Sequence, residues 1–334
     1  MKKKLIVLVF TLLGFTFESG AQIFGDLGSN RVATTSFPFL KIGVGAREVG
    51  MAETGISTVN DANALFLNPS HITGLPNYSV SISQNQWFAD ISQTAFAGII
   101  RFDNDWTYGL SLNYLTTAPM ERRTTLQPRG TGEKFGFYDL AMGLTIARQM
   151  TAQFSFGVTG KFINERLAEL NYNAYAIDLG MSYLMDNDLD GRLSITLMNF
   201  SGRFKPSGKA TPPDTDAKTT FQDYNTPSTF QLGYQITPLK SEDQSLMLAF
   251  QLNHPNDNSE NYSIGAEYEW AKMIYLRTGY KFNVVAQTVP SFGVGIRKSL
   301  ILFDFQFDYG TSYIDPLGMS HRFTLSLYPI TNGF

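Results

Sequence analysis

The fold class is decided by the stretch Leu300-Ile-Leu-Phe-Asp-Phe-Gln-Phe-Asp-Tyr309. Its odd-numbered positions from 301 to 309 are aliphatic or aromatic, whereas positions 304, 306 and 308 are acidic or amide. A period of two residues places these sets on opposite faces of a β-strand; a helix would scatter both around its axis. A soluble sandwich would turn the apolar face to its core, and a membrane barrel would turn it to lipid. One strand fits both folds, so the choice depends on how often the pattern recurs and how the copies are joined.

The first 21 residues have the layout of a secretory signal peptide. Three lysines at positions 2–4 precede an apolar run at 5–17, and Ser19-Gly20-Ala21 offers small residues for cleavage. The run is too short to span a bilayer comfortably, and the alternative is a buried N-terminal strand. We therefore expect residues 1–21 to be removed and the remaining chain to be exported.

The composition limits the classes of partner. Without residues 1–21 the chain carries 23 basic and 28 acidic residues, a net charge of about −5, which does not suit a nucleic-acid surface. No later stretch approaches 18 uninterrupted apolar residues, so no transmembrane helix is expected. The chain has no cysteine, which excludes a lipoprotein anchor and a disulfide framework.

The alternating pattern recurs along the whole chain after residue 77. Fourteen segments have strand character, and many begin or end with an aromatic residue, where an interfacial girdle would lie. They span residues 78–86, 94–102, 106–117, 138–148, 153–166, 172–185, 191–200, 227–239, 244–254, 261–270, 273–283, 289–298, 300–310 and 320–330.

The lengths of the connections also tend to alternate. Short polar turns at 103–105, 149–152, 186–190, 240–243, 271–272 and 298–299 lie between longer links at 87–93, 118–137, 167–171, 201–226, 255–260, 284–288 and 311–319. An outer-membrane barrel has short periplasmic turns at one end and longer loops at the other, whereas a Greek-key sandwich has no such regularity. We predict an all-β fold, a transmembrane antiparallel up-and-down β-barrel of about 14 strands over residues 77–334.

The polar faces of these strands carry charges of both signs. They include Arg101, Asp139, Lys161, Asp178, Glu267, Glu269, Arg277, Lys281, Arg297, Asp304 and Asp308. On the lipid face at mid-depth each Arg or Lys would cost about 2–4 kcal/mol, so we place them in the lumen. A mixed interior favours a plugged or narrow lumen over an ion pore lined by one sign of charge.

Residues 22–76 differ from the strands and are interpreted as an N-terminal extension and hatch. Asp61 suits a helix N-cap, and a short helix is expected at 62–67. Pro69 ends this helix because it biases Asn68 away from the helical conformation.

The same segment carries Gly45-Ala46-Arg47, Gly50-Met51, Asp61-Ala62 and Asn68-Pro69, followed by Trp87 with Asp90-Ile91, Gly130-Thr131-Gly132, and Gly157 with Lys161. In this order the motifs resemble the PorV/PorQ family, a Bacteroidetes branch of the FadL-like barrels. The likeness covers most of the first half of the chain. Ala52-Glu53 departs from the small residues and glycine that the family tends to have there.

The resemblance implies a FadL-like barrel of fourteen strands with an N-terminal hatch segment inside it. It assigns the hatch motif to Gly45, Arg47, Gly50, Met51, Asp61, Asn68 and Pro69. Some members of the family belong to the type IX secretion system, where the PorV-type barrel binds the translocon and receives cargo C-terminal domains. Other FadL-like barrels pass hydrophobic molecules.

Two long loops are the candidate partner-binding surfaces, because long loops at one end of a barrel tend to carry binding. The loops are 118–137 and 201–226, and the candidate residues in them are Arg122, Arg123, Arg129, Arg203, Phe204 and Lys205. The alternative is that these loops only shield the barrel.

No motif indicates catalysis, a metal or a cofactor. The glycines at 43, 45 and 50 miss the spacing of a dinucleotide loop, no G-x-S-x-G elbow occurs, and the three histidines are far apart in sequence. The acidic runs at 186–190 and 256–260 are interpreted as solvated turns rather than calcium loops. We therefore predict no enzymatic activity.

We predict an integral protein of the bacterial outer membrane that acts as an accessory or cargo-handling subunit of type IX secretion. The expected partners are the large outer-membrane translocon, cargo C-terminal domains, and outer-membrane lipid or lipopolysaccharide. The alternative is a FadL-like channel for hydrophobic small molecules, which would need an apolar pocket and a movable hatch. A purely structural outer-membrane protein is a third interpretation.

Overall fold

The structure is a computed structural model that describes residues 34–102, 105–208, 222–300 and 303–329. The predicted signal peptide and residues 22–33 of the N-terminal extension lie outside the described residues.

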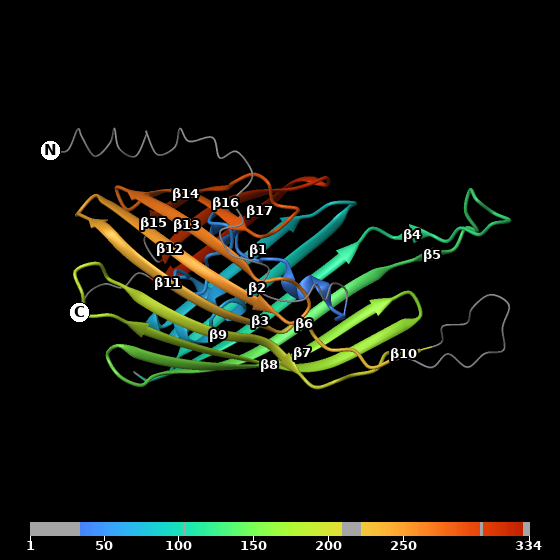
Figure 1. Cartoon of the computed structure of the whole chain (residues 1–334), viewed down its shortest axis with the longest axis horizontal. Coiled ribbons are helices and arrows are strands. Elements are labelled where there is room, and N and C mark those ends of the chain that lie inside the picture. The colour runs from blue at the N-terminus through green and yellow to red at the C-terminus, as the bar shows by residue number, and fades with distance from the viewer. Residues whose placement is uncertain (1–33, 103–104, 209–221, 301–302, 330–334) are drawn as a thin grey trace.

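Fourteen long antiparallel strands of the described chain form one closed barrel (Figure 1). They are β1 (Tyr78–Gln86), β2 (Ile91–Arg101), β3 (Trp106–Thr117), β6 (Phe137–Gln149), β7 (Phe154–Leu167), β8 (Leu170–Leu184), β9 (Arg192–Ser201), β11 (Thr229–Lys240), β12 (Gln244–Pro255), β13 (Asn261–Trp270), β14 (Ile274–Phe282), β15 (Ser291–Ser299), β16 (Phe303–Ile314) and β17 (Gly318–Pro329). Neighbours in the barrel follow the order of the chain, and β1 pairs with β17 to close the ring. The predicted up-and-down barrel is confirmed.

Three short strands lie outside this ring. β4 (Met120–Glu121) and β5 (Lys134–Phe135) pair with each other in the link between β3 and β6, and β10 (Ser207–Gly208) pairs with the start of β8. Figure 1 shows all three at the same end of the barrel, which we name the long-loop end. Among the described residues, no helix is both long and apolar enough to cross a membrane.

The two faces of each strand differ in exposure as the alternation predicts. In β16, Phe307 is 43% exposed, whereas the neighbouring Asp308 is fully buried. In β8, Tyr175 is 76% exposed and Asp178 is fully buried. Apolar side chains therefore cover the outer wall and polar ones face the lumen, which is the pattern that lipid requires.

Two predicted connections are wrong. Residues 167–171 were expected to form a longer link, but β7 ends at Leu167 and β8 begins at Leu170. Residues 311–319 were also expected to form a longer link, but β16 ends at Ile314 and β17 begins at Gly318. β7 and β8 are 14 and 15 residues long, and a membrane-spanning strand needs about 9–11. Both strands therefore continue beyond the bilayer as a hairpin with a tight turn, so residues assigned to a loop are paired.

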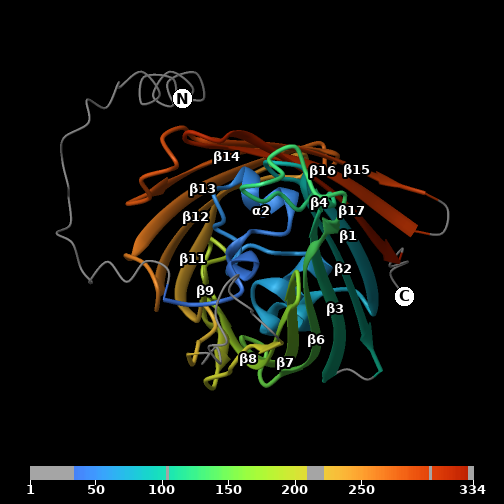
Figure 2. The same cartoon turned by 90° about the vertical axis from the view of Figure 1, so that its right-hand side faces the viewer.

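Residues 37–76, named here the luminal segment, lie inside the ring (Figure 2). The segment contains η1 (Pro38–Lys41), α2 (Ala46–Gly50), η2 (Ala62–Phe66) and η3 (Pro69–Gly74). η2 is capped by Asp61, whose side chain accepts a hydrogen bond from the Asn63 N–H, so the predicted N-cap is confirmed. The helix at η3 was not predicted; it begins at Pro69, a residue that suits the first helical turn.

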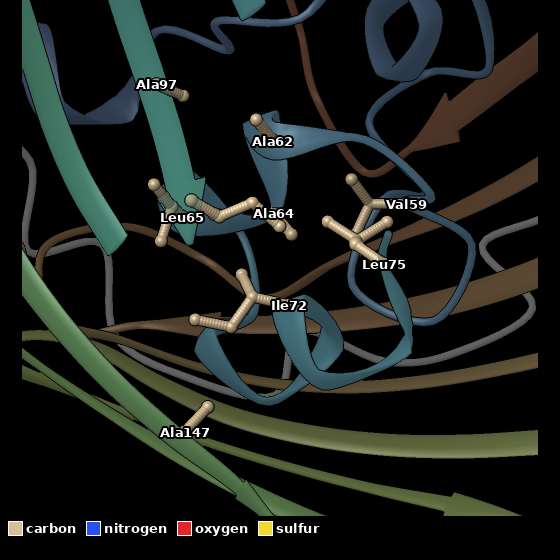
Figure 3. Packing of buried hydrophobic residues seen from close by; sticks show 9 residues of the cluster. Val59, Ala62, Ala64, Leu65, Ile72, Leu75, Ala97 and Ala147 are labelled. Carbon is tan, nitrogen blue, oxygen red and sulfur yellow. The ribbon is translucent and has the colours of Figure 1, made fainter. Parts of the chain in front are cut away.

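The luminal segment has two apolar contacts with the barrel wall. Residues of η2 and η3 pack with β2 and β6 in the cluster drawn in Figure 3, which consists of Val59, Ala62, Ala64, Leu65, Ile72, Leu75, Ala97, Ile99 and Ala147. Nearer the long-loop end, Phe37 and Phe39 pack against β3, β6, β7 and β8 through Leu115, Ala141, Ile163, Ala174 and Ala176. In both places alanines of the wall leave room for the segment: Ala97 and Ala147 in the first contact, and Ala141, Ala174 and Ala176 in the second.

Candidate functional site: the filled lumen and the long-loop rim

A buried charge network joins the luminal segment to the wall. Arg47 of α2 donates two hydrogen bonds to the Glu267 carboxylate of β13, at 2.9 and 2.8 Å, and a third to the Thr58 carbonyl at 2.9 Å. Arg277 of β14 contacts the same Glu267 at 2.5 Å and Asp308 of β16 at 2.6 Å. Bidentate arginine–carboxylate pairs fix geometry as well as charge. The network therefore holds α2 in one orientation against three strands.

Two further carboxylates of the luminal segment lie beside this network. Asp61 accepts hydrogen bonds from Asn63 and from Ser326 of β17, the latter at 3.1 Å. Glu48 is buried, and neither of its carboxylate oxygens has a hydrogen-bond partner in the described chain; its nearest cation is Arg47, at 3.6 Å. Burial raises the pKa of Glu48 to about 7, and the negative charge of Asp61 acts in the same direction. The strength with which the luminal segment is held in the barrel therefore depends on whether Glu48 is protonated.

α2 touches the backbone of the wall where four successive strands present glycine to the lumen. A Cβ on Gly279 would lie 2.4 Å from the Met51 carbonyl carbon, and a Cβ on Gly310 would lie 2.1 Å from the Ala46 carbonyl oxygen. From the other side, a Cβ on Gly50 would lie 2.8 Å from the Cα of a wall glycine. Real Cβ atoms do not approach so closely, so any larger residue would push the helix away from the wall. The wall glycines are Gly265, Gly279, Gly293 and Gly310.

At Gly45, the N-cap of α2, the space for a side chain is limited by Glu48 rather than by the barrel wall. A Cβ at position 45 would lie 1.9 Å from a Glu48 carboxylate oxygen. The glycine therefore leaves room for the buried carboxylate.

Asn68 and Pro69 form the second close contact, at the end of the barrel with the short turns. The Asn68 side chain donates to the Ile56 carbonyl at 2.9 Å and accepts from the Ser70 N–H at 3.1 Å. A Cβ on Gly157 of β7 would lie 2.5 Å from the Pro69 carbonyl carbon. Seven residues predicted as a hatch motif thus occupy two contact regions, α2 with Asp61 and the start of η3.

Ala52 and Glu53, which depart from the family pattern, occupy backbone positions that suit glycine. Both have a positive φ, 53° and 63°, a conformation that glycine adopts at little cost. The Glu53 carboxylate forms an ion pair with Lys281 of β14. Although burial acts in the opposite direction, the Lys281 ammonium holds the pKa of Glu53 below its usual value. Glu53 therefore adds an ion pair between segment and wall that a glycine would lack.

A cavity of about 350 Å³ remains between the luminal segment and the β3–β12 side of the wall. Much of its wall lining is amide: Asn113, Asn199, Gln231, Gln251 and Asn253, with Lys161 nearby. Several of these groups bond to one another, as in Gln231 to Asn253 at 2.9 Å and Gln251 to Asn253 at 2.7 Å. Gln251 also accepts the Ile56 N–H of the luminal segment at 3.2 Å. Apolar side chains complete the lining, which is therefore mixed in polarity; they include Leu40, Ile42, Val44, Phe66, Met142 and Met198.

At the long-loop end, the β4–β5 hairpin carries three of the predicted partner-binding residues. Arg122 lies 3.5 Å from Glu133 of the same hairpin and 3.6 Å from Glu169 in the β7–β8 turn. Arg123 and Arg129 are exposed to solvent. Two of these three basic side chains are thus available at the tip of a projecting hairpin.

The other three predicted residues are split between solvent and the barrel. Arg203 is exposed, and Lys205 is exposed with Asp223 at 3.5 Å. Phe204 turns inward, where its ring packs at a tilt against Phe37 with the ring centroids 4.8 Å apart. Phe204 therefore covers the luminal segment, while Arg203 and Lys205 face solvent.

Sequence reasoning missed the partners of the hatch motif. It placed Glu267, Arg277 and Asp308 in the lumen but did not pair them with Arg47. It also missed the role of the wall glycines. The sequence pattern that could have revealed this role is the recurrence of glycine on the luminal face of four successive predicted strands.

The geometry of the barrel defines the class: an outer-membrane β-barrel of the FadL-like fold with a filled lumen. Solved structures with this fold include a toluene transporter TodX from P. putida (TM-score 0.55, 12% identity, covering 85% of this chain and 96% of that chain) and the CymD monoaromatic hydrocarbon channel (TM-score 0.53, 13%, 85% and 96%). A FadL homologue from Pseudomonas aeruginosa is similar too (TM-score 0.51, 9%, 86% and 98%). At such identities the likeness shows the fold alone.

The family of the chain is assigned by comparing its sequence with protein-family models. Residues 26–254 match the model of the type IX secretion system protein PorV, and the chain belongs to this family. A search of curated protein sequences gives no match. The chain is therefore a type IX secretion protein, and both the family and the fold are of a non-enzymatic kind.

Proposed function

We propose that this protein is an accessory subunit of type IX secretion that binds the outer-membrane translocon and cargo C-terminal domains. The binding surface would be the long-loop end, together with the adjacent outer wall of β6, β7 and β8. In this proposal residues 1–21 are a signal peptide that is removed on export, and outer-membrane lipid or lipopolysaccharide surrounds the wall.

The observation that carries this proposal is the fixed attachment of the luminal segment. A channel must open its lumen, yet here Arg47 and Glu267 form a buried bidentate pair and α2 rests against wall backbone. Moving α2 away from the wall would leave these buried charges unpaired, which is unfavourable. A lumen held closed in this way suits a protein that works with its rim and outer wall rather than with its interior.

The projecting hairpins support a binding role for the rim. β7 and β8 extend beyond the length that a bilayer requires, and the β4–β5 hairpin is joined to their turn through Arg122 and Glu169. A paired extension holds its side chains in place better than a long irregular loop, so less entropy is lost on binding. Arg123 and Arg129 would then meet an acidic surface on the partner.

The test is a pull-down from native outer membranes with the tagged full-length protein. We expect a very large barrel partner to copurify, and we expect the triple variant R122E/R123E/R129E to lose most of it. The matched control reverses three exposed charges at the short-turn end, K240E/K272E/K298E, and should retain the partner. Recovery of the monomer alone with bound lipid would contradict the proposal and favour the FadL-like channel for hydrophobic molecules.

A further inference from the structure

Two acidic side chains face each other on the luminal side of the wall, at the long-loop end. Asp139 of β6 lies directly opposite Glu165 of β7 in the register of the two strands. Both residues are buried, with 1% and 9% of their surface exposed. Directly opposed residues on one face of a sheet have Cβ atoms about 4.5–5.5 Å apart, so the two carboxylates share one small space.

No basic side chain compensates this pair. Elsewhere on the wall, the buried Glu267 and Asp308 contact arginines. Among the described residues, none with a positive charge lies within ion-pair distance of Asp139 or Glu165. Lys161 lies four residues away on the luminal face of β7 and is already paired with an aspartate of β8 at 2.6 Å. Two carboxylates held so close repel each other, and burial removes the water that would screen them.

The two carboxylates also lack hydrogen-bond donors. Both Asp139 oxygens and Oε2 of Glu165 are buried without a hydrogen-bond partner in the described chain, and so is the Thr117 hydroxyl of β3. Leu115 is the partner of Asp139 on β3, so Thr117, the next residue on the same face, is a diagonal neighbour of Asp139. Four buried oxygen atoms from three adjacent strands thus have no partner, which is unfavourable unless a ligand satisfies them.

The first residues of the luminal segment lie beside this pair. Phe37 belongs to the same apolar cluster as Ala141 and Ile163, the next luminal residues on β6 and β7. Glu165 accepts a backbone hydrogen bond from Phe37, whose ring packs against Phe204. These side chains shield the pair from bulk water, and a low dielectric strengthens the attraction between carboxylates and a cation.

We propose that Asp139 and Glu165 bind a calcium ion, with the Thr117 hydroxyl as a third oxygen ligand. Calcium takes six to eight oxygen ligands in a flexible geometry, and each carboxylate can supply one or two of them. A donor set of oxygen atoms alone favours calcium over zinc, which prefers nitrogen and sulfur ligands. Water molecules and backbone carbonyls would complete the coordination.

A shared proton is the other way to relieve the repulsion, and it fits these atoms less well. One proton between the two carboxylates leaves a net negative charge where no basic side chain compensates it. It also bridges two oxygen atoms only, so the second Asp139 oxygen and the Thr117 hydroxyl stay without a partner. A divalent cation neutralises both charges and contacts oxygen atoms of all three side chains.

The ion would join three strands at the place where the projecting hairpins leave the barrel. The β4–β5 hairpin lies in the link between β3 and β6, and β7 continues into the hairpin with β8. Calcium should therefore stiffen the proposed binding rim, although ion binding itself does not depend on the secretion role. With few carboxylates, the site should resemble extracellular calcium modules, with a dissociation constant on the order of 0.1–1 mM.

The direct test uses the purified full-length protein in detergent, freed of divalent cations by a chelator. Tb³⁺ serves as the luminescent probe, sensitised by Tyr172, which lies opposite Glu165 on β8. We expect saturable luminescence that Ca²⁺ displaces with a dissociation constant on the order of 0.1–1 mM. Displacement by Mg²⁺ should be at least about tenfold weaker, because Mg²⁺ demands near-ideal octahedral geometry. The absence of a saturable signal would overturn the proposal.

Matched variants separate this site from other calcium bound to the protein or to residual lipid. D139N/E165Q should weaken calcium binding about tenfold or more and should still fold, because it removes the repulsion. D188N/E242Q neutralises two exposed acidic residues at the short-turn end and should bind as the wild type does. T117V should weaken binding too, and its equality with the wild type would remove the hydroxyl from the ligand set.

Two results would assign the pair another role. Equal calcium binding by D139N/E165Q and the wild type would overturn the proposal outright. A urea unfolding midpoint that calcium leaves unchanged, but that acidification raises in the wild type and not in D139N/E165Q, would show a shared proton and overturn it as well. Calcium that raises the midpoint of the wild type and of D188N/E242Q, but not that of D139N/E165Q, would support it.

Discussion

At the scale of single residues, Arg47 ties the luminal segment to the wall through two hydrogen bonds to Glu267. R47M would leave Glu267 facing Arg277 alone and would remove the bond to the Thr58 carbonyl. We expect the free energy of unfolding in urea with detergent to fall by about 3–5 kcal/mol, because one partner of a buried pair is lost. R123M, which changes an exposed arginine on the β4–β5 hairpin, should alter it by less than about 0.5 kcal/mol. Equal effects of the two variants would show that the network does not hold the segment.

Glu48 predicts a dependence of stability on pH. Its pKa is raised to about 7 in the folded chain, chiefly by burial and then by Asp61, and is 4.5 in a solvated side chain. A raised folded-state pKa adds stability that is fully present below pH 4.5 and is lost as pH rises through about 7. Between pH 5 and 8 the wild-type protein should lose on the order of 2–3 kcal/mol relative to E48Q, which cannot ionise.

His71 acts in the opposite direction within the same pH range. Burial, assisted by the charge of Arg192, lowers its pKa to about 3, so the folded chain loses stability as pH falls below the usual value of 6.5. The comparison with E48Q therefore isolates the contribution of Glu48, since His71 is present in both proteins. Parallel pH profiles for the two proteins would show that Glu48 is not buried as described.

At the scale of elements, the alternation of each strand predicted the wall well, because lipid and lumen impose opposite requirements on successive residues. Residues 303–310 of the strand predicted at 300–310 lie in β16 with the predicted faces, and Asp61 caps the predicted short helix. The longer links predicted at 167–171 and 311–319 were wrong because the strands on either side of each link stay paired up to a turn of two or three residues. The pairing of Arg47 with Glu267 joins residues 220 positions apart, and no local pattern encodes it.

The contact between α2 and β14 can be tested by a substitution in the wall. G279A adds a methyl group 2.4 Å from the Met51 carbonyl carbon, so α2 must move away from β14. We expect faster proteolysis within residues 37–76 of the folded barrel and a lower unfolding midpoint. G160A on β7 is the matched control, because a Cβ there meets no atom within 4 Å. Identical proteolysis of the two variants would contradict direct contact between α2 and the wall.

At the scale of the whole molecule, the barrel has a lipid-facing wall, a filled lumen and one elaborated end. The family assignment makes it a type IX secretion protein, and the fold is shared with hydrocarbon channels. The two roles differ in whether the luminal segment must move. A channel has to displace residues 37–76, whereas a subunit that binds partners at its rim can keep them fixed.

Crosslinking the luminal segment to the wall tests this difference most directly. The Ala46 N–H donates to the Thr324 hydroxyl at 3.0 Å, and the chain contains no cysteine, so A46C/T324C introduces the sole thiol pair. We predict that cells carrying the crosslinked protein secrete type IX cargo as well as cells carrying either single variant. Secretion that stops on crosslinking and returns on reduction would contradict the account, because it would mean that the segment has to move.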